Sequence, residues 1–212
     1  MKKEQDYSRD LADIRQMMER SSKFLSLSGL SGVFAGIYAL CGAYIASTLF
    51  QFNPSQLYYS IAEIEQQHID LQRTFILAVI VLVLAIITAA LFSYKNAIKH
   101  SGSVWNATTR RLIINLMIPL VAGGILLLLL FHHSLLGWLA PFSMIFYGLG
   151  ILNASKYTYN DIRGLGIIQI TLGLIASVHI EFGLIIWAIG FGLMHIVYGI
   201  YLHLKYERES NN

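Results

Sequence analysis

Residues 112–131 read LIINLMIPLVAGGILLLLLF, a run of 20 residues without an ionisable side chain. A bilayer core about 30 Å thick needs roughly 20 such residues for one helix to cross it. Five further apolar stretches lie on either side of this one. Together the six occupy residues 24–50, 74–93, 112–131, 135–153, 165–180 and 182–202. The sequence therefore predicts an all-α, polytopic membrane protein with six transmembrane helices.

The composition agrees with this prediction. The chain has 212 residues, of which 56% are hydrophobic and only 13% are charged, and its mean hydropathy is +0.59. An ordinary soluble domain carries about a quarter of its residues as charges, so a soluble globular enzyme is not expected. The single cysteine, Cys41, cannot form an intramolecular disulfide, which excludes a disulfide-stapled secreted scaffold.

The basic residues predict the orientation of the chain. Of the 15 Lys and Arg residues, 14 precede the first stretch, follow the last, or lie in the connections on the same side of the membrane, and Arg73 is the exception. The positive-inside rule makes that side cytoplasmic. We therefore expect a multi-pass protein of a bacterial plasma (inner) membrane with both termini in the cytoplasm.

The apolar stretches also predict how the chain is divided. The expected parts are a cytoplasmic amphipathic segment at 1–23, a transmembrane domain at 24–203 with an outer helical loop at 51–73, and a cytoplasmic tail at 204–212. In the first part, Leu11, Ile14 and Met18 recur at helical spacing. This apolar face either docks a partner or the membrane surface, or packs on the bundle itself.

Two local features bear on how the helices pack. Ser28, Gly32 and Gly36 recur every four residues, and small residues at this spacing let membrane helices approach closely. The stripe serves either packing within the chain or contact with a second copy. Pro141 removes a backbone N–H, so we expect a kink in the stretch 135–153.

The second half of the chain has an internal echo at a spacing of 49 to 51 residues. Gly137-Trp138, Tyr147-Gly148 and Lys156-Tyr157 are followed by Trp187, Tyr198-Gly199 and Lys205-Tyr206. The echo predicts a bundle built from repeated helical hairpins.

With these elements, the region from Ile118 to Lys205 resembles the HdeD-type family of six-helix bacterial membrane proteins. The resemblance implies a six-helix fold and a role in acid stress, and it carries no catalytic residue. The run Met-Met-Glu-Arg-Ser-Ser-Lys-Phe that enters the first stretch also resembles small integral membrane proteins of Bacteroidota. That second resemblance implies no function.

Histidines gather at the predicted outer face. His132, His133 and His179 lie in the two tight outer connections, and Glu181 follows His179 by two residues. Imidazole and carboxylate groups that converge there would bind Zn²⁺ or another transition metal, and imidazole also ligates haem. Histidine also titrates as the outside pH falls from 7 to 5, so the same residues would serve as a proton sensor. A third interpretation is that they are ordinary polar residues of interfacial turns.

His195 differs from the other histidines because it lies well inside the sixth stretch. Ionisable groups at such depth face the bundle interior or a water-filled cavity. Gln169 in the fifth stretch, together with Tyr147 and Tyr198, offers hydrogen-bond partners. The sequence therefore predicts an intramembrane polar site at His195 and Gln169, which is either a buried, hydrogen-bonded histidine or a site for a solute, a proton or haem.

The sequence contains no nucleophile elbow, Walker A loop, intramembrane aspartate pair or dinucleotide fingerprint, so we expect no enzyme. The function favoured by the sequence is a non-enzymatic scaffold or a stress-related regulatory protein. The alternatives are a small-solute or ion pathway through the bundle, and metal or haem binding by the outer histidines; otherwise no cofactor is expected. Expected partners are membrane lipids and a second copy or a cytoplasmic protein. Nucleic acid is not expected, because the basic residues are spread over loops next to the membrane.

Overall fold

The computed structural model describes residues 28–50, 64–100 and 105–207. All regular structure in these ranges is helical, which confirms the predicted all-α class. Five helical segments are long and apolar enough to cross a membrane, and a sixth, shorter apolar helix accompanies them. This architecture is compatible with a multi-pass membrane protein.

The described elements are as follows. The α-helices are α2 (Gly29–Thr48), α3 (Ile64–His100), α4 (Ala107–His132), α5 (Leu139–Ala154), α6 (Ile162–Val178), α7 (Gly183–Trp187) and α8 (His195–Leu202). The 3₁₀ turns are η2 (Leu136–Trp138), η3 (Ser155–Tyr157) and η4 (Ile180–Phe182), and the π-helical segments are η5 (Ala188–Met194) and η6 (His203–Glu207). Because α7, η5, α8 and η6 are continuous, we call residues 183–207 the last helix.

The helix bounds differ from the predicted stretches mainly at α3. This helix begins at Ile64, so residues 64–73 of the predicted outer loop continue into the second apolar stretch as one helix. The predicted amphipathic segment at 1–23 lies outside the described residues, as does the rest of the predicted loop at 51–63. Of the predicted tail, residues 204–207 belong to η6.

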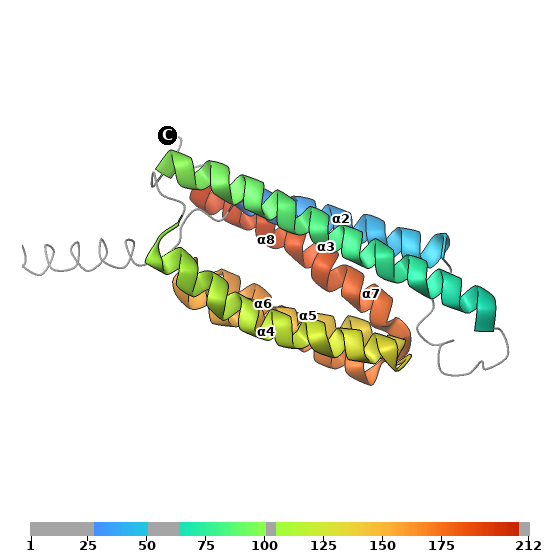
Figure 1. Cartoon of the computed structure of the whole chain (residues 1–212). Coiled ribbons are helices and arrows are strands. Elements are labelled where there is room, and N and C mark those ends of the chain that lie inside the picture. Colours follow the sequence, from blue (N-terminus) through green and yellow to red (C-terminus); the bar gives the residue numbers. More distant parts are fainter. Residues whose placement is uncertain (1–27, 51–63, 101–104, 208–212) are drawn as a thin grey trace, which may run out of the picture.

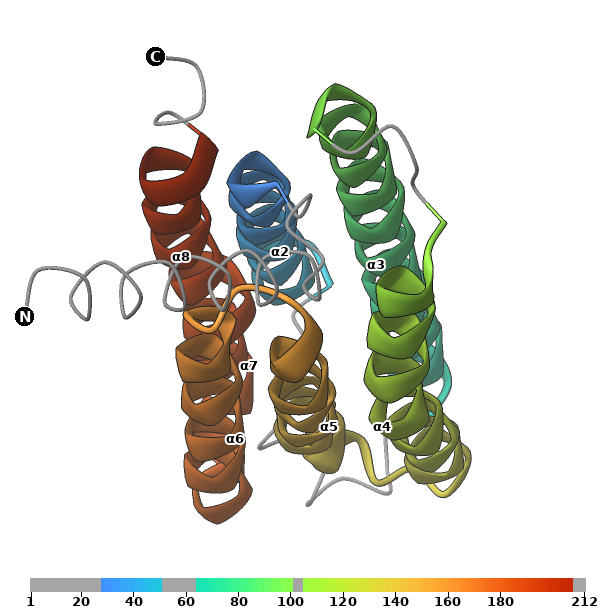
Figure 2. The same cartoon turned by 90° about the vertical axis from the view of Figure 1, so that its left-hand side faces the viewer.

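The helices form two layers. Figure 2 shows α8, α2 and α3 side by side in one layer, and α6, α5 and α4 in the other, in agreement with the residue contacts between neighbouring helices. The last helix joins the layers, because α7 packs on α5 and α6 whereas α8 packs on α2. In Figure 1 it crosses from one layer to the other along its length.

The bundle has two chemically different ends. The starts of α2, α4 and α6 and the ends of α3, α5 and the last helix lie at one end (Figure 1). We call it the basic end, because its helix termini and connections carry Arg110, Arg111, Lys156, Arg163 and Lys205. The opposite end carries His132, His133 and His179, and we call it the histidine end.

Glycines allow close helix packing within both layers. A Cβ atom on Gly36 of α2 would lie 2.6 Å from the carbonyl oxygen of Gly192 in the last helix. In the other layer, a Cβ atom on Gly148 of α5 would lie 2.7 Å from the carbonyl oxygen of Gly166 in α6. Gly32 likewise packs against the backbone of Gly199. The small-residue stripe of α2 is therefore used inside the chain, where it brings the backbones of α2 and the last helix into contact.

The outer surface of the bundle is apolar. None of the most apolar 18-residue window within Gln72–Ile98 is buried, and large aliphatic side chains such as Leu82, Ile86 and Leu91 are more than half exposed there. A helix that is hydrophobic all round belongs in a protein core or in a lipid bilayer. Since α3 has neighbours on one side only, its surface is of the kind that lipid covers.

The kink was expected because Pro141 would remove a hydrogen bond within its helix, and this premise is wrong. Pro141 is the third residue of α5, in the first turn, where a backbone N–H has no partner within the helix. It therefore costs no intrahelical hydrogen bond. Among the described residues, the proline in a helix interior is Pro119 of α4.

Candidate functional site

Three helices bring polar side chains together where the two layers meet. Tyr147 comes from α5, Gln169 from α6 and His195 from the last helix. The Tyr147 hydroxyl lies 2.7 Å from Nε2 of His195, and Nδ1 of His195 lies 3.0 Å from the carbonyl oxygen of Gly190. Gln169 Nε2 donates to the same carbonyl at 2.8 Å. We call these four residues the polar centre.

Local structure explains why these residues meet. Gln169 lies on the buried stripe of α6 with Leu165, Gly166 and Gly173, which recur at helical spacing. His195 follows directly after the π-helical segment η5, and π-helical turns widen a helix and are frequent at functional sites. Within η5, the carbonyl of Gly190 accepts both side-chain hydrogen bonds.

The polar centre is buried among apolar and aromatic groups. Gln169 is 0% exposed and His195 is 6% exposed, and Met144 beside them is also 0% exposed. The imidazole ring stacks on Phe191 with 5.6 Å between ring centroids, and the Tyr147 ring lies 5.4 Å from the imidazole. Polar groups in such surroundings are stable only when hydrogen-bonded.

The hydrogen bonds determine where the protons lie. A carbonyl oxygen only accepts, so Nδ1 of His195 carries a proton and donates to Gly190, and Nε2 accepts from the Tyr147 hydroxyl. The same reasoning orients the Gln169 amide with its nitrogen toward Gly190. The 3.5 Å contact between Gln169 Nε2 and His195 Nδ1 then joins two donors and contributes no hydrogen bond. The amide oxygen, Gln169 Oε1, is buried and has no hydrogen-bond partner among the described residues.

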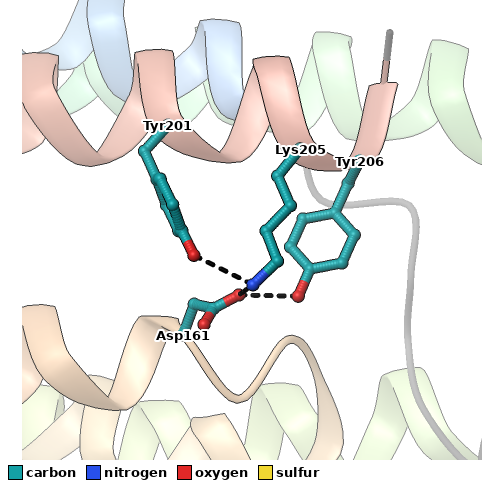
Figure 3. Close-up of polar contacts among 4 residues, drawn as sticks. All are labelled: Asp161, Tyr201, Lys205 and Tyr206. Atoms are coloured by element: carbon teal, nitrogen blue, oxygen red, sulfur yellow. Dashed lines mark hydrogen bonds and ion pairs between the residues drawn. The ribbon is translucent and has the colours of Figure 1, made fainter. Parts of the chain in front are cut away.

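A second polar cluster lies at the basic end (Figure 3). Lys205 Nζ donates to Asp161 Oδ2 at 2.8 Å and to the Tyr201 hydroxyl at 2.9 Å, and the Tyr206 hydroxyl donates to Asp161 Oδ2 at 2.6 Å. We call these four residues the basic-end clamp. The hydrogen bonds from Lys205 and Tyr206 lower the pKa of Asp161 below its ordinary value. The clamp ties the start of α6 to the end of the last helix.

The predicted metal-binding residues form two separate pairs. His132 and His133 are neighbours at the end of α4, with 5.3 Å between ring centroids, and His179 Nδ1 lies 3.6 Å from Glu181 Oε1. No group of three or more His, Cys, Asp or Glu side chains that could hold a metal ion occurs within residues 28–50, 64–100 and 105–207. Metal or haem binding at this end stays a prediction.

Sequence reasoning named part of the site. It proposed His195 with Gln169 and Tyr147: Tyr147 contacts His195 directly, and Gln169 and His195 share the Gly190 carbonyl. Tyr198, also proposed as a partner, lies instead against Gly164 of α6. The Gly190 carbonyl was not foreseen, because a backbone acceptor leaves no mark in the sequence.

Asp161 was also missed, although Lys205-Tyr206 had been singled out as part of the internal echo. An aspartate in the connection before α6, on the same side as Lys205, was the signal available for their pairing.

Comparison of the chain with protein-family models, curated proteins and solved structures finds no match. The resemblance to HdeD-type proteins stays a prediction.

Proposed function

We propose that this chain is a multi-pass membrane protein that provides a pathway for a proton or a small polar solute, with the polar centre as its binding site. The observation that carries the proposal is the burial of His195, which is 6% exposed and hydrogen-bonded at both ring nitrogens inside the bundle. Ionisable residues within membrane-spanning helices are costly, and they mark solute, ion or proton pathways.

The chemistry of the centre supports proton handling. In the observed state Tyr147 donates to Nε2 of His195 at 2.7 Å. A proton that arrives at Nε2 reverses this bond, because the protonated nitrogen then donates to the tyrosine oxygen. The Gly190 carbonyl keeps the ring oriented in both states, since Nδ1 carries its proton throughout. The pair can thus take up and release a proton without a change of ring position.

The pathway was an alternative in the sequence analysis, and we favour it because of the polar centre. The scaffold function depends on the apolar face at Leu11, Ile14 and Met18, which lies outside the described residues. It stays a prediction, as does the assignment to a bacterial inner membrane. We retain the orientation with the basic end in the cytoplasm, which rests on the distribution of Lys and Arg.

Flux through proteoliposomes tests the proposal. Liposomes containing the purified protein and a pH-sensitive dye are exposed to a pH gradient, and then to gradients of small neutral and charged solutes. We expect His195→Gln, which keeps hydrogen-bonding atoms but cannot titrate at these pH values, to reduce the flux of at least one of these species to the rate of empty liposomes. His132→Gln, at the histidine end, is the matched control and should behave as the wild type.

Tyr147→Phe is a second variant, because it removes the donor to Nε2 and keeps the ring that packs on His195. Its thermal unfolding in detergent shows whether the bundle still folds. Wild-type flux in both His195→Gln and Tyr147→Phe would remove the polar centre as the site of a pathway.

A further inference from the structure

The polar centre contains a buried hydrogen-bond acceptor that no group of the described residues uses. The Tyr147 hydroxyl, His195 Nδ1 and Gln169 Nε2 each have an acceptor within 3.0 Å. Gln169 Oε1 has no partner in the described part of the chain, although Gln169 is 0% exposed. A buried carbonyl oxygen without a hydrogen bond is costly, so a molecule that donates to it is favoured at this position.

The surroundings of the centre disfavour an anion. Between Arg163 and Lys205 the chain contains no Lys or Arg, and the same is true between Arg111 and Lys156. These two ranges contain all of the polar centre. The imidazole is flanked instead by the rings of Phe191 and Tyr147. A buried anion would lack a counter-charge, whereas aromatic faces attract cations.

Gly190 lies directly beside the unused oxygen. A Cβ atom on Gly190 would lie 2.9 Å from Gln169 Oε1 and 3.2 Å from Met144 Sδ. Any side chain at position 190 would therefore crowd the oxygen. Met144 bounds the same space with an unbranched side chain that has several rotatable bonds, so it can move aside for a small molecule.

From these three observations we propose that the polar centre binds a small hydrogen-bond donor without negative charge, of the class of ammonia or ammonium, which donates to Gln169 Oε1. This rests on the proposed pathway. Anions of similar size are disfavoured, because the ranges that hold the centre contain no Lys or Arg and the rings beside the imidazole present faces that attract cations instead.

The test compares ammonium with an anion in the same proteoliposomes. Pulses of ammonium chloride and of methylammonium chloride are followed by the internal pH dye, and sodium nitrate and sodium formate serve as anion probes. Gln169→Leu removes the amide at similar volume. We expect it to lower the protein-dependent ammonium flux roughly tenfold, the scale of one lost hydrogen bond to a buried group.

Two further variants sharpen the test. Thr171→Val is the matched control on α6, because Thr171 is exposed and its hydroxyl bonds only to Ile167 of its own helix; it should keep the wild-type flux. Gly190→Ala should reduce ammonium flux as well, since its methyl group would sit beside Oε1.

The outcomes distinguish a failure of the inference from a failure of the proposed pathway. Ammonium flux that is equal in wild type and Gln169→Leu would overturn the assignment of Oε1, which would then hold a structural water only. His195-dependent flux of nitrate or formate would overturn the donor class and leave the pathway standing. If no probe shows flux that depends on His195, the pathway and the inference fail together.

Discussion

A histidine buried in an apolar bundle needs a partner for each ring nitrogen, and His195 has both. Tyr147 serves one nitrogen and the Gly190 carbonyl serves the other. Leaving either nitrogen without its partner would cost about 1–3 kcal/mol, which is a large part of the stability of a typical domain. At the residue scale the polar centre is therefore a set of mutually dependent groups, and single substitutions there test function only alongside a measurement of folding.

Asp161 offers a residue-scale prediction about pH. Hydrogen bonds from Lys205 and Tyr206 lower its pKa in the folded state, so the ionised carboxylate stabilises the fold. This contribution is fully present above the unfolded-state pKa of about 3.9 and is lost as pH falls through the lower folded-state value. We expect Asp161→Asn to be less stable than wild type at pH 7, and the difference to shrink as pH falls below about 4.

Thermal unfolding in detergent between pH 7 and pH 3 measures this difference. Glu181→Gln is the control, because Glu181 is half-exposed and its contact with His179 is long, at 3.6 Å. A stability difference for Asp161→Asn that stays constant over the whole range would contradict the assignment to the ionised carboxylate.

At the scale of elements, glycine position decides whether a side chain is tolerated. A Cβ atom on Gly36 would lie 2.6 Å from the Gly192 carbonyl oxygen, which is backbone and cannot rotate away, whereas at Gly124 of α4 it would meet nothing within 4 Å. We expect Gly36→Ala to destabilise the protein by about 1–3 kcal/mol through overpacking. Gly124→Ala should instead stabilise it by up to about 1 kcal/mol, because alanine favours the helix. Unfolding by chemical denaturant in mixed micelles compares the two, and equal effects would contradict the packing of α2 on the last helix.

The same scale shows what the sequence could and could not predict. Runs of apolar residues predict helices well, because a helix needs about 20 predominantly apolar residues to cross a bilayer core. They do not predict where α3 begins, since residues 64–73 carry polar side chains and nonetheless continue the helix. The sequence does not predict the π-helical segment η5 either, because no pattern in its seven residues distinguishes a π-helical turn from an α-helical one.

The site was predictable to a similar degree. The depth of His195 in its apolar stretch indicated that it is a candidate site residue. Gln169 was predicted as its partner because polar side chains within apolar stretches usually pair with one another. The sequence does not determine which tyrosine contacts His195. Tyr147 and Tyr198 were equally good partners by sequence, and only the crossing of the last helix between the layers places Tyr147 at the imidazole.

For the whole molecule, the last helix connects layers that otherwise meet little. It packs on α5 and α6 at the histidine end and on α2 at the basic end, and the polar centre lies along this crossing. The basic-end clamp holds the far end of the same helix to the start of α6. Side-chain hydrogen bonds thus connect the two layers at two places: at the polar centre inside the bundle and at the basic-end clamp on its surface.

The orientation of this bundle gives the last prediction. From the positive-inside rule we expect the basic end in the cytoplasm and the histidine end outside. In a Cys41→Ser background, we expect a membrane-impermeant maleimide to label Ser134→Cys in intact cells, because Ser134 is exposed in the turn after α4. Lys156→Cys, exposed in η3 at the basic end, should react only after the membrane is permeabilised. The protein with Cys41 alone is the control: Cys41 is exposed midway along α2, where lipid should shield it from the reagent. Labelling of Lys156→Cys but not Ser134→Cys in intact cells would reverse the orientation, and the side from which a donor enters the polar centre would reverse with it.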